Sequence, residues 1–166
     1  MNFIGNGLSG AYFSPCRVWR YTLWRRWEEC DLSRMCVFVC LNPSTADETK
    51  NDPTVTRCIN FSKAWGFSGF VMLNLFGFRA TDPKEMKAAA DPVGPENDSA
   101  IEAVCRQAGR VVFAWGADGL HQSRCHHVTD LLDSIGVKPM YLVKTLNHQP
   151  GHPLYVRADT EPKPWE

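Results

Sequence analysis

A run of seven apolar residues, Met35 to Leu41 (MCVFVCL), most constrains the fold of this chain. The run does not alternate between apolar and polar residues, so it predicts a strand that is buried on both faces. FVMLNLF (70–76) and RVVFAW (110–115) are also mainly apolar and predict two further buried strands. Strands of this kind are typical of parallel sheets, whose two faces are covered by helices.

Helix signals lie between these strands. Asp52-Pro53 fits an N-cap followed by proline at the first helical position, and Gly66 is placed to end the helix. The same kinds of signal predict helices that open at Asp82-Pro83 and Pro95-Glu96, a helix closed by Gly136, and a fourth strand over Pro139 to Lys144.

The order of these elements predicts an α/β fold. Strands that alternate with helices favour a short, mainly four-stranded parallel sheet with right-handed crossovers, hence a three-layer α/β/α sandwich. The segment 12–27 interleaves aromatic residues with arginine and predicts an added antiparallel hairpin or edge pair. We expect one domain over 1–166, with the hairpin at 10–27, an α/β core at 35–145 and a proline-rich tail at 147–166.

Charge and composition restrict the partners. The 18 Lys and Arg residues balance 18 Asp and Glu residues, which gives no support for general coating of nucleic acid. A local basic patch remains possible, from Arg17, Arg20, Arg25 and Arg26. No apolar run approaches the roughly 20 residues of a membrane span, and the N-terminus lacks a signal-peptide pattern. We therefore expect a cytoplasmic protein with no membrane partner.

The seven cysteines predict buried thiols rather than a metal site. A zinc site requires paired short spacings such as Cys-x2-Cys, and the sequence has none. It also lacks the Gly-x4-Gly-Lys-Ser/Thr phosphate loop and the Gly-x-Ser-x-Gly elbow of esterases. We expect neither a bound metal nor another cofactor.

Polar residues follow each buried strand, at the sheet edge where ligands bind such folds. In chain order these candidate site residues are Asn42, Pro43, Ser44 and Thr45, then Asn74, Phe76 and Arg79, then Trp115 and Gly116, and finally Lys144, His152 and Pro153. Each motif alone fits an ordinary turn. Independent turns have no reason to converge, so their shared position at one edge predicts a binding site.

The chemistry of this set favours a nucleobase ligand. An amide side chain offers a donor and an acceptor, as reading a base edge requires, and an aromatic wall stacks on a base face. A neutral histidine near a carbonyl can stabilise developing negative charge.

Long ordered motifs link the chain to a known family. LNPSTADETKNDPTVTRC (41–58), AWGFSGFVMLNLFGFRATDP (64–83), PVGPENDSAI (92–101), FAWGADG (113–119) and GHPLY (151–155) resemble domain-of-unknown-function family 1643 of bacteria and phages. The resemblance covers nearly the whole chain and implies membership without an activity.

The order of four motifs also resembles the uracil-DNA glycosylase superfamily, a three-layer α/β/α fold. The segment 40–44 (CLNPS) is similar to the Gly-Ile-Asn-Pro-Gly motif that ends the first strand there. Asn74 matches the pyrimidine-reading asparagine of the second strand. Trp115-Gly116 and His152-Pro153-Leu154 follow in the same order. Ser44 replaces a glycine, and the last motif is shortened, so a single-stranded, modified or free nucleotide substrate is expected in place of uracil in duplex DNA.

This resemblance implies a glycosylase-like hydrolase that breaks the N-glycosidic bond of a damaged or modified base. As a hypothesis, Asn42 positions a water, Asp47 or Asp52 acts as the general base, and His152 stabilises the leaving base. In the same hypothesis, Asn74 reads the edge of the base, and Phe76 or Trp115 stacks on its face. Phosphate is held by Ser44, Thr45 and Arg79.

Two alternatives stay open. One is a hydrolase or transferase that acts on a free nucleotide or nucleoside, with Asp47, Glu48 and Asp52 binding magnesium. The other is a non-catalytic module that binds a nucleotide or a modified base. The expected partner is thus DNA or a free nucleotide, and the sequence does not give the oligomeric state. For Asp52, helix capping alone is a sufficient explanation.

Overall fold

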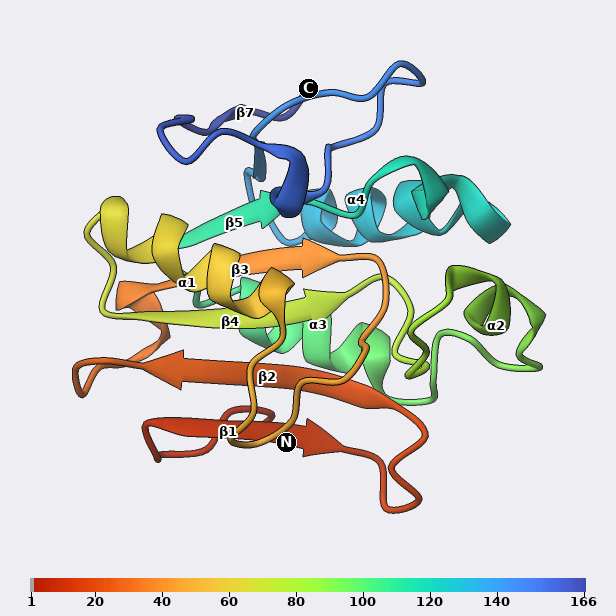
Figure 1. Cartoon of the computed structure of the whole chain (residues 1–166), viewed down its shortest axis with the longest axis horizontal. Coiled ribbons are helices and arrows are strands. Elements are labelled where there is room, and N and C mark those ends of the chain that lie inside the picture. The colour runs from red at the N-terminus through yellow and green to blue at the C-terminus, as the bar shows by residue number, and fades with distance from the viewer. Residues whose placement is uncertain (1) are drawn as a thin grey trace.

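The computed structural model describes residues 2–166 and has a mixed α/β fold built on one seven-stranded sheet (Figure 1). The strands are Ser9–Phe13 (β1), Arg20–Arg26 (β2), Met35–Cys40 (β3), Gly69–Asn74 (β4), Arg110–Phe113 (β5), Met140–Tyr141 (β6) and Lys163–Pro164 (β7). Their order across the sheet is β1-β2-β4-β3-β5-β6-β7. The pairs β4–β3, β3–β5 and β5–β6 are parallel, and the pairs at both outer ends of the sheet are antiparallel.

Four α-helices occur within residues 2–166: Pro53–Ala64 (α1), Pro83–Ala88 (α2), Asn97–Cys105 (α3) and Arg124–Ser134 (α4). Three 3-10 helices add Leu32–Arg34 (η1), Ala117–Ser123 (η2) and Pro153–Tyr155 (η3). The two predicted Asp-Pro helix starts are confirmed. Asp52 and Asp82 are N-caps whose side chains accept hydrogen bonds from backbone N–H groups, and proline follows each of them.

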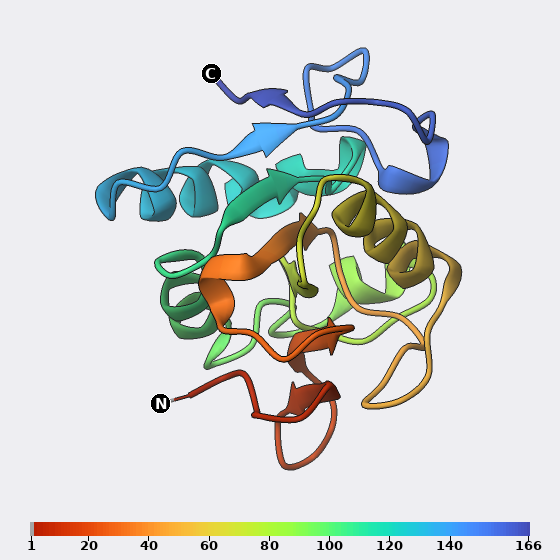
Figure 2. The same ribbon diagram turned by 90° about the vertical axis from the view of Figure 1, so that its left-hand side faces the viewer.

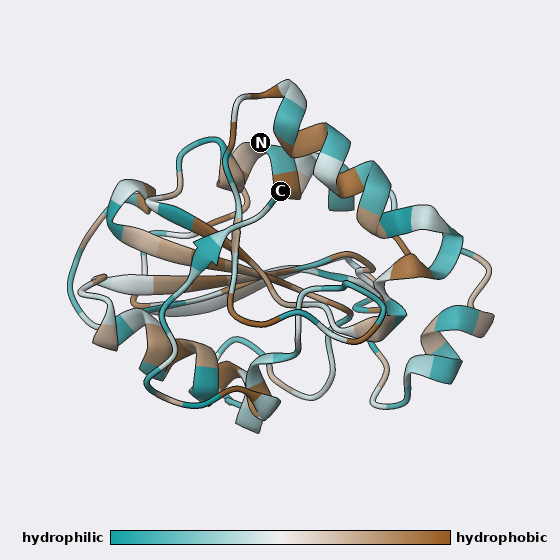
Figure 3. Ribbon diagram, turned by 90° about the horizontal axis from the view of Figure 1, so that it is seen from above, coloured by the Kyte–Doolittle hydropathy of each residue, from teal (hydrophilic) through white to brown (hydrophobic). Residues whose placement is uncertain are grey.

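The central strands bury both faces, as the apolar runs predicted. Along β3, Met35, Val37 and Val39 join a cluster with residues of α3 and α4. The alternate residues Cys36, Phe38 and Cys40 join a second cluster with residues of α1. Figures 2 and 3 show the same arrangement, with helices on both sides of the sheet. Alternation of side chains across a strand requires this division of the core into two clusters.

The sheet is larger than the sequence predicted. The expected N-terminal hairpin, β1 and β2, forms an edge pair of the sheet, because β2 pairs antiparallel with β4. The tail supplies β7, which pairs with β6. Both additions cover strand edges that would otherwise expose unpaired peptide groups. The strand expected over 139–144 is limited to Met140–Tyr141.

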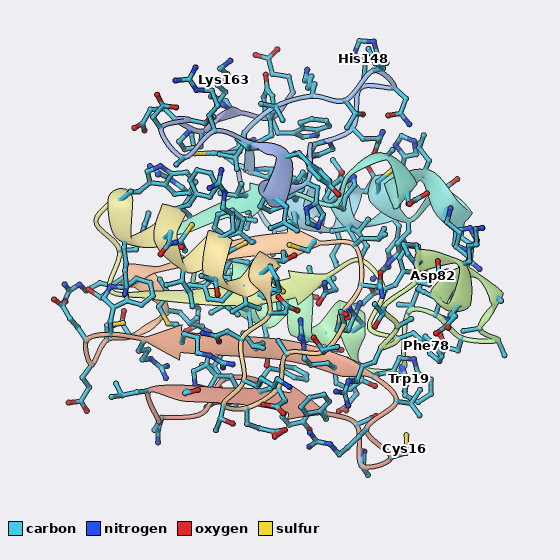
Figure 4. The ribbon with its side chains drawn as sticks, in the orientation of Figure 1. Cys16, Trp19, Phe78, Asp82, His148 and Lys163 are labelled. Atoms are coloured by element: carbon cyan, nitrogen blue, oxygen red, sulfur yellow. The ribbon has the colours of Figure 1, made fainter. Side chains whose placement is uncertain are left out.

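A tryptophan fixes the segment that leaves β4. Trp19 forms an isolated antiparallel bridge with Phe78, and Figure 4 shows the two residues close together. The Trp19 indole Nε1 donates a hydrogen bond to the carbonyl of Asp91, at 2.9 Å. Gly94, with a φ of +93°, leaves space for this indole, which an added Cβ would contact at 2.7 Å.

No helix within residues 2–166 is long and apolar enough to cross a bilayer.

We expect Phe38→Ala to lower the free energy of unfolding by about 3–5 kcal/mol, because a buried aromatic ring leaves a cavity when it is removed. The Phe38 ring is fully buried and stacks on Trp65 at a centroid distance of 5.9 Å. Urea denaturation measures the change. Leu146→Ala is the control, because Leu146 is fully exposed, and its expected change is within about 0.5 kcal/mol. Equal effects of the two substitutions would contradict this account of the core.

Candidate functional site

A cavity of about 600 Å³ opens where the parallel strands β3 and β5 end. The arrowheads of β3, β4 and β5 in Figure 1 point to the same side of the molecule. Five segments form the walls: the residues after β3, the start of α1, the segment from Ala80 to Pro83, the residues after β5, and the loop at His152. The cavity therefore lies at the carboxyl edge of the sheet, where the sequence predicted a site.

Seven of the fourteen sequence-predicted residues line this cavity. They are Asn42, Ser44, Thr45, Asp52, Trp115, Gly116 and His152. The other seven do not line it: Pro43, Asp47, Asn74, Phe76, Arg79, Lys144 and Pro153. The structure thus brings together the ends of β3 and β5, the start of α1 and the His152 loop.

Asp47 is engaged in its own loop. Its Oδ1 accepts hydrogen bonds from the backbone N–H groups of Thr49 and Lys50, at 3.0 and 2.8 Å. These bonds lower the pKa of the Asp47 carboxyl. Its neighbour Glu48 forms an exposed ion pair with Arg17 at 2.7 Å. Asp47, Glu48 and Asp52 therefore do not converge on one point, as a shared magnesium ion would require.

Aromatic contacts and burial account for four further residues outside the cavity. The Arg79 guanidinium lies 4.7 Å from the centre of the Phe13 ring. Lys144 lies over two aromatic rings of the β6–β7 region. Phe76 is fully buried against the ring of His121, and Pro153 is buried with its carbonyl accepting a hydrogen bond from an arginine of α1.

Asn42 joins two walls of the cavity. Its Nδ2 donates to the carbonyl of Ala80 at 2.8 Å and to the carbonyl of Pro43 at 3.1 Å. The backbone N–H of Ala80 donates in return to the carbonyl of Pro43, at 2.9 Å. These bonds orient the amide of Asn42, and its Oδ1 accepts no hydrogen bond from residues 2–166. Asn42 therefore presents a fixed acceptor beside the cavity.

Asp52 has two roles: it caps a helix and it lines the cavity. Its Oδ1 caps α1 by accepting a hydrogen bond from the backbone N–H of Val55, at 2.8 Å. The residue also lines the cavity, together with Pro53 and Thr54 of the first turn. The capping bond fixes the carboxylate at the cavity wall, because it restrains the side-chain torsion angles.

His152 is neutral in one defined tautomer. Its Nδ1 accepts a hydrogen bond from the backbone N–H of Leu154 at 3.2 Å, so the proton of the neutral ring resides on Nε2. Burial lowers the pKa of His152 below its ordinary value of 6.5, and the charge of Asp52 opposes this shift only in part. The ring thus offers an N–H donor without a positive charge.

The end of β5 forms a rigid aromatic wall. Trp115 is buried, and its Nε1 donates to Oε1 of Gln149 at 2.9 Å. Gly116 has a φ of +77°, which a residue with a side chain adopts only under strain, and its N–H donates to the carbonyl of Pro150 at 2.7 Å. Gly119 packs on the indole so closely that an added Cβ would collide with the ring.

Arg20 is a site residue that the sequence pattern did not predict. Arg20 is only 1% exposed, although the residue lines the cavity from β2. The basic patch that the sequence left open therefore does not include Arg20, nor Arg25, which is 7% exposed. The sequence offered no signal for this burial, because successive side chains of a strand point to opposite faces and an arginine beside apolar residues can be exposed or buried.

Comparison with known proteins identifies a family. Residues 20–154 match the model of a family described as Protein of unknown function (DUF1643). The matched range contains every residue that lines the cavity except Tyr155. Neither the curated proteins nor the solved structures contain a match to the chain.

We expect Asp52→Ala to lower the free energy of unfolding by about 1 kcal/mol, because α1 loses its N-cap. Asp52→Asn should leave stability nearly unchanged, because asparagine caps helices as well as aspartate does. Urea denaturation of both variants measures the difference. Equal stabilities of the two variants would show that the capping bond contributes nothing.

His152 should titrate with a midpoint below 6.5, which NMR of the imidazole protons measures against pH. Its folded-state pKa is lowered, so the unfolded chain binds the proton first and the free energy of unfolding falls as the pH drops through 6.5. Asp52→Asn should lower the midpoint further, because the carboxylate favours the charged ring. A midpoint at or above 6.5 would contradict the assigned burial.

Proposed function

The chain belongs to the DUF1643 family, and we propose that it is a glycosylase-like hydrolase that breaks the N-glycosidic bond of a damaged or modified base. The observation that carries this proposal is the presence of Asn42, Asp52 and His152 in one cavity. They supply a fixed acceptor, a carboxylate and a neutral N–H donor. Hydrolysis of an N-glycosidic bond uses these functions to orient water, to accept its proton and to stabilise the departing base.

The arrangement of the helices supports the same proposal. With α1 packed on one face of the sheet and α3 and α4 on the other, we interpret the fold as the three-layer α/β/α type of the uracil-DNA glycosylase superfamily. The cavity receives Asn42 from the end of the first parallel strand, Trp115-Gly116 from the third, and His152 from the last loop. This is the order in which the matching motifs occur in that superfamily.

The proposed reaction begins with a water molecule held by Oδ1 of Asn42. Asp52 accepts a proton from this water as the water oxygen bonds to C1′ of the sugar. Of the two candidate carboxylates, Asp47 and Asp52, we assign this role to Asp52, because Asp52 lines the cavity and Asp47 does not. The sugar passes through an oxocarbenium-like state, as sugars do when such bonds break.

The departing base takes the electron pair of the C1′–N bond and becomes an anion. The Nε2–H of His152 donates a hydrogen bond to a carbonyl oxygen of this anion. A neutral ring suits the task because it is the only form of this histidine that keeps its bond from Leu154 N–H. The base then takes a proton from solvent.

The remaining walls suit a nucleoside. A cavity of about 600 Å³ has the size of ordinary small-molecule sites. Trp115, which is 2% exposed, forms part of the wall beside the base, while Ser44 and Thr81, whose hydroxyl oxygens lie 3.3 Å apart, are placed to bind phosphate or sugar oxygens. A base inside a duplex must first leave the stack, so single-stranded DNA is the favoured polymer.

An oligonucleotide panel tests the proposed function. Single- and double-stranded DNA with one uracil, hydroxymethyluracil, hypoxanthine or other modified base is incubated with the protein and then with hot alkali. We expect cleavage at one modified base, and Asp52→Asn and Asn42→Ala should each reduce the rate by a factor on the order of 10²–10⁴.

Asp82→Asn is the matched control, because Asp82 caps α2 before a proline, as Asp52 caps α1, but does not line the cavity. Its rate should equal that of the wild type. Absence of cleavage at every base would reject the proposal. In that case, turnover of free nucleotides would identify a nucleotide hydrolase or transferase. Binding of nucleotides without turnover would identify a non-catalytic binding module.

A further inference from the structure

Two buried arginines of β2 differ in how their guanidinium groups are bonded. All three nitrogens of Arg25 donate hydrogen bonds, to the carbonyls of five residues and to Oδ1 of Asn51. Four of these acceptors belong to the loop of residues 47–51. Arg25 therefore has a complete structural role: it holds this loop against the sheet.

Arg20 is buried more deeply and is bonded less completely. One terminal nitrogen donates to the carbonyl of Ala46 at 3.1 Å, and the other is near the thioether sulfur of Met72 and Oδ1 of Asn74, at 3.2 and 3.3 Å. A thioether is a weak acceptor. The Nε of Arg20 is buried and has no partner among residues 2–166.

The charge of Arg20 is also unpaired. No carboxylate within residues 2–166 lies within 4.0 Å of its guanidinium. Asp52 acts on it only from a longer distance, and burial lowers the pKa of Arg20 to about 10, so it remains charged at neutral pH. A buried cation without a counter-ion opposes folding, and within residues 2–166 the oxygen acceptors of the Arg20 guanidinium are one peptide carbonyl and one amide oxygen.

This cation lies in the buried floor of the cavity, which we define as Arg20, Cys40 and Met72 from the neighbouring strands β2, β3 and β4. A second unpartnered donor adjoins it. Asn74 is 1% exposed, its Oδ1 accepts from Arg20, and its Nδ2 is buried without a partner. Two buried donors without acceptors, one of them on a cation, favour a ligand group that brings acceptors and negative charge.

We propose that the buried floor is a subsite for a negatively charged oxygen group of the ligand, which Arg20 binds, with Asn74 adjoining it as the acceptor of one Arg20 N–H. The subsite rests on the proposed function and deepens it. In the hydrolysis described above, the departing base carries negative charge on its carbonyl oxygens, and a fixed cation in a dry site stabilises that charge. A phosphate group of a nucleotide offers the same chemistry, so the experiment includes both sources.

Calorimetric titration at neutral pH tests this subsite with three probes: uracil, 5-nitrouracil, which is anionic at that pH, and inorganic phosphate. We expect one of the two anions to bind at least about tenfold more tightly than uracil. Tighter binding of 5-nitrouracil identifies the oxygen of a base anion, and tighter binding of phosphate identifies a nucleotide phosphate. If neither anion binds more tightly than uracil, the subsite is rejected.

Asn74→Asp is the most informative variant, because it has nearly the same shape and places a carboxylate against Arg20. We expect it to reduce binding of the preferred anion by about tenfold or more and to raise the melting temperature, since the buried cation gains a partner. Arg20→Met should reduce anion binding to the same extent, and Arg25→Met is its control. Arg25→Met should melt at a lower temperature than wild type but bind the anion within about twofold of it.

Anion binding that is unchanged in both Asn74→Asp and Arg20→Met would overturn the proposal. These titrations require no turnover, so their outcome is separate from that of the oligonucleotide panel. Anion binding without base release would reject the glycosylase and retain the subsite. Base release without selective anion binding would retain the glycosylase and reject the subsite.

Discussion

Parallel pairing of β3 with β4 on one side and β5 on the other determines where every candidate functional group lies. The registers place Cys40 beside Asn74 and Val39 beside Phe113, so the three strands end at one level of the sheet. Complete burial of β3 on both faces prevents a shift of this register, because a slip of one residue would exchange its two hydrophobic clusters. The cavity exists because loops that leave one level of the sheet must share the space above it.

The loops keep their positions through partly buried hydrogen bonds to peptide groups. Arg25 holds the loop of residues 47–51, Asn42 joins the end of β3 to Ala80, and the Gly116 N–H is bonded to the carbonyl of Pro150. Each bond connects segments that are distant in sequence. Such anchoring reduces the conformational entropy that a site loses when it binds a ligand, and it fits a site that is formed before the ligand arrives.

Stability and function make opposite demands on the floor of this cavity. For stability alone, either an apolar residue at position 20 or a carboxylate beside Arg20 would be favourable, because each would avoid an unpaired buried charge. Among residues 2–166 no carboxylate lies within 4.0 Å of the Arg20 guanidinium, and the buried Nε of Arg20 has no partner. His152 lines the same cavity as a neutral group. Burial lowers the pKa of its ring, although the nearby Asp52 carboxylate favours the charged form. The two groups thus combine a permanent cation with a neutral donor in one small volume.

The sequence by itself determined the three central strands, the two Asp-Pro helix starts and seven of the residues that line the cavity. Apolar runs and Asp-Pro caps act over a few residues, so β3 and the start of α1 could be predicted from local pattern. Tertiary structure alone decided that β2 extends the sheet, that Asp47 turns toward its own backbone, and that Arg20 reaches the cavity. An arginine beside apolar residues has the same local pattern whether its charge meets solvent, a carbonyl or a cavity. Only the strand that pairs next to it, here β4, settles which of these surrounds the guanidinium.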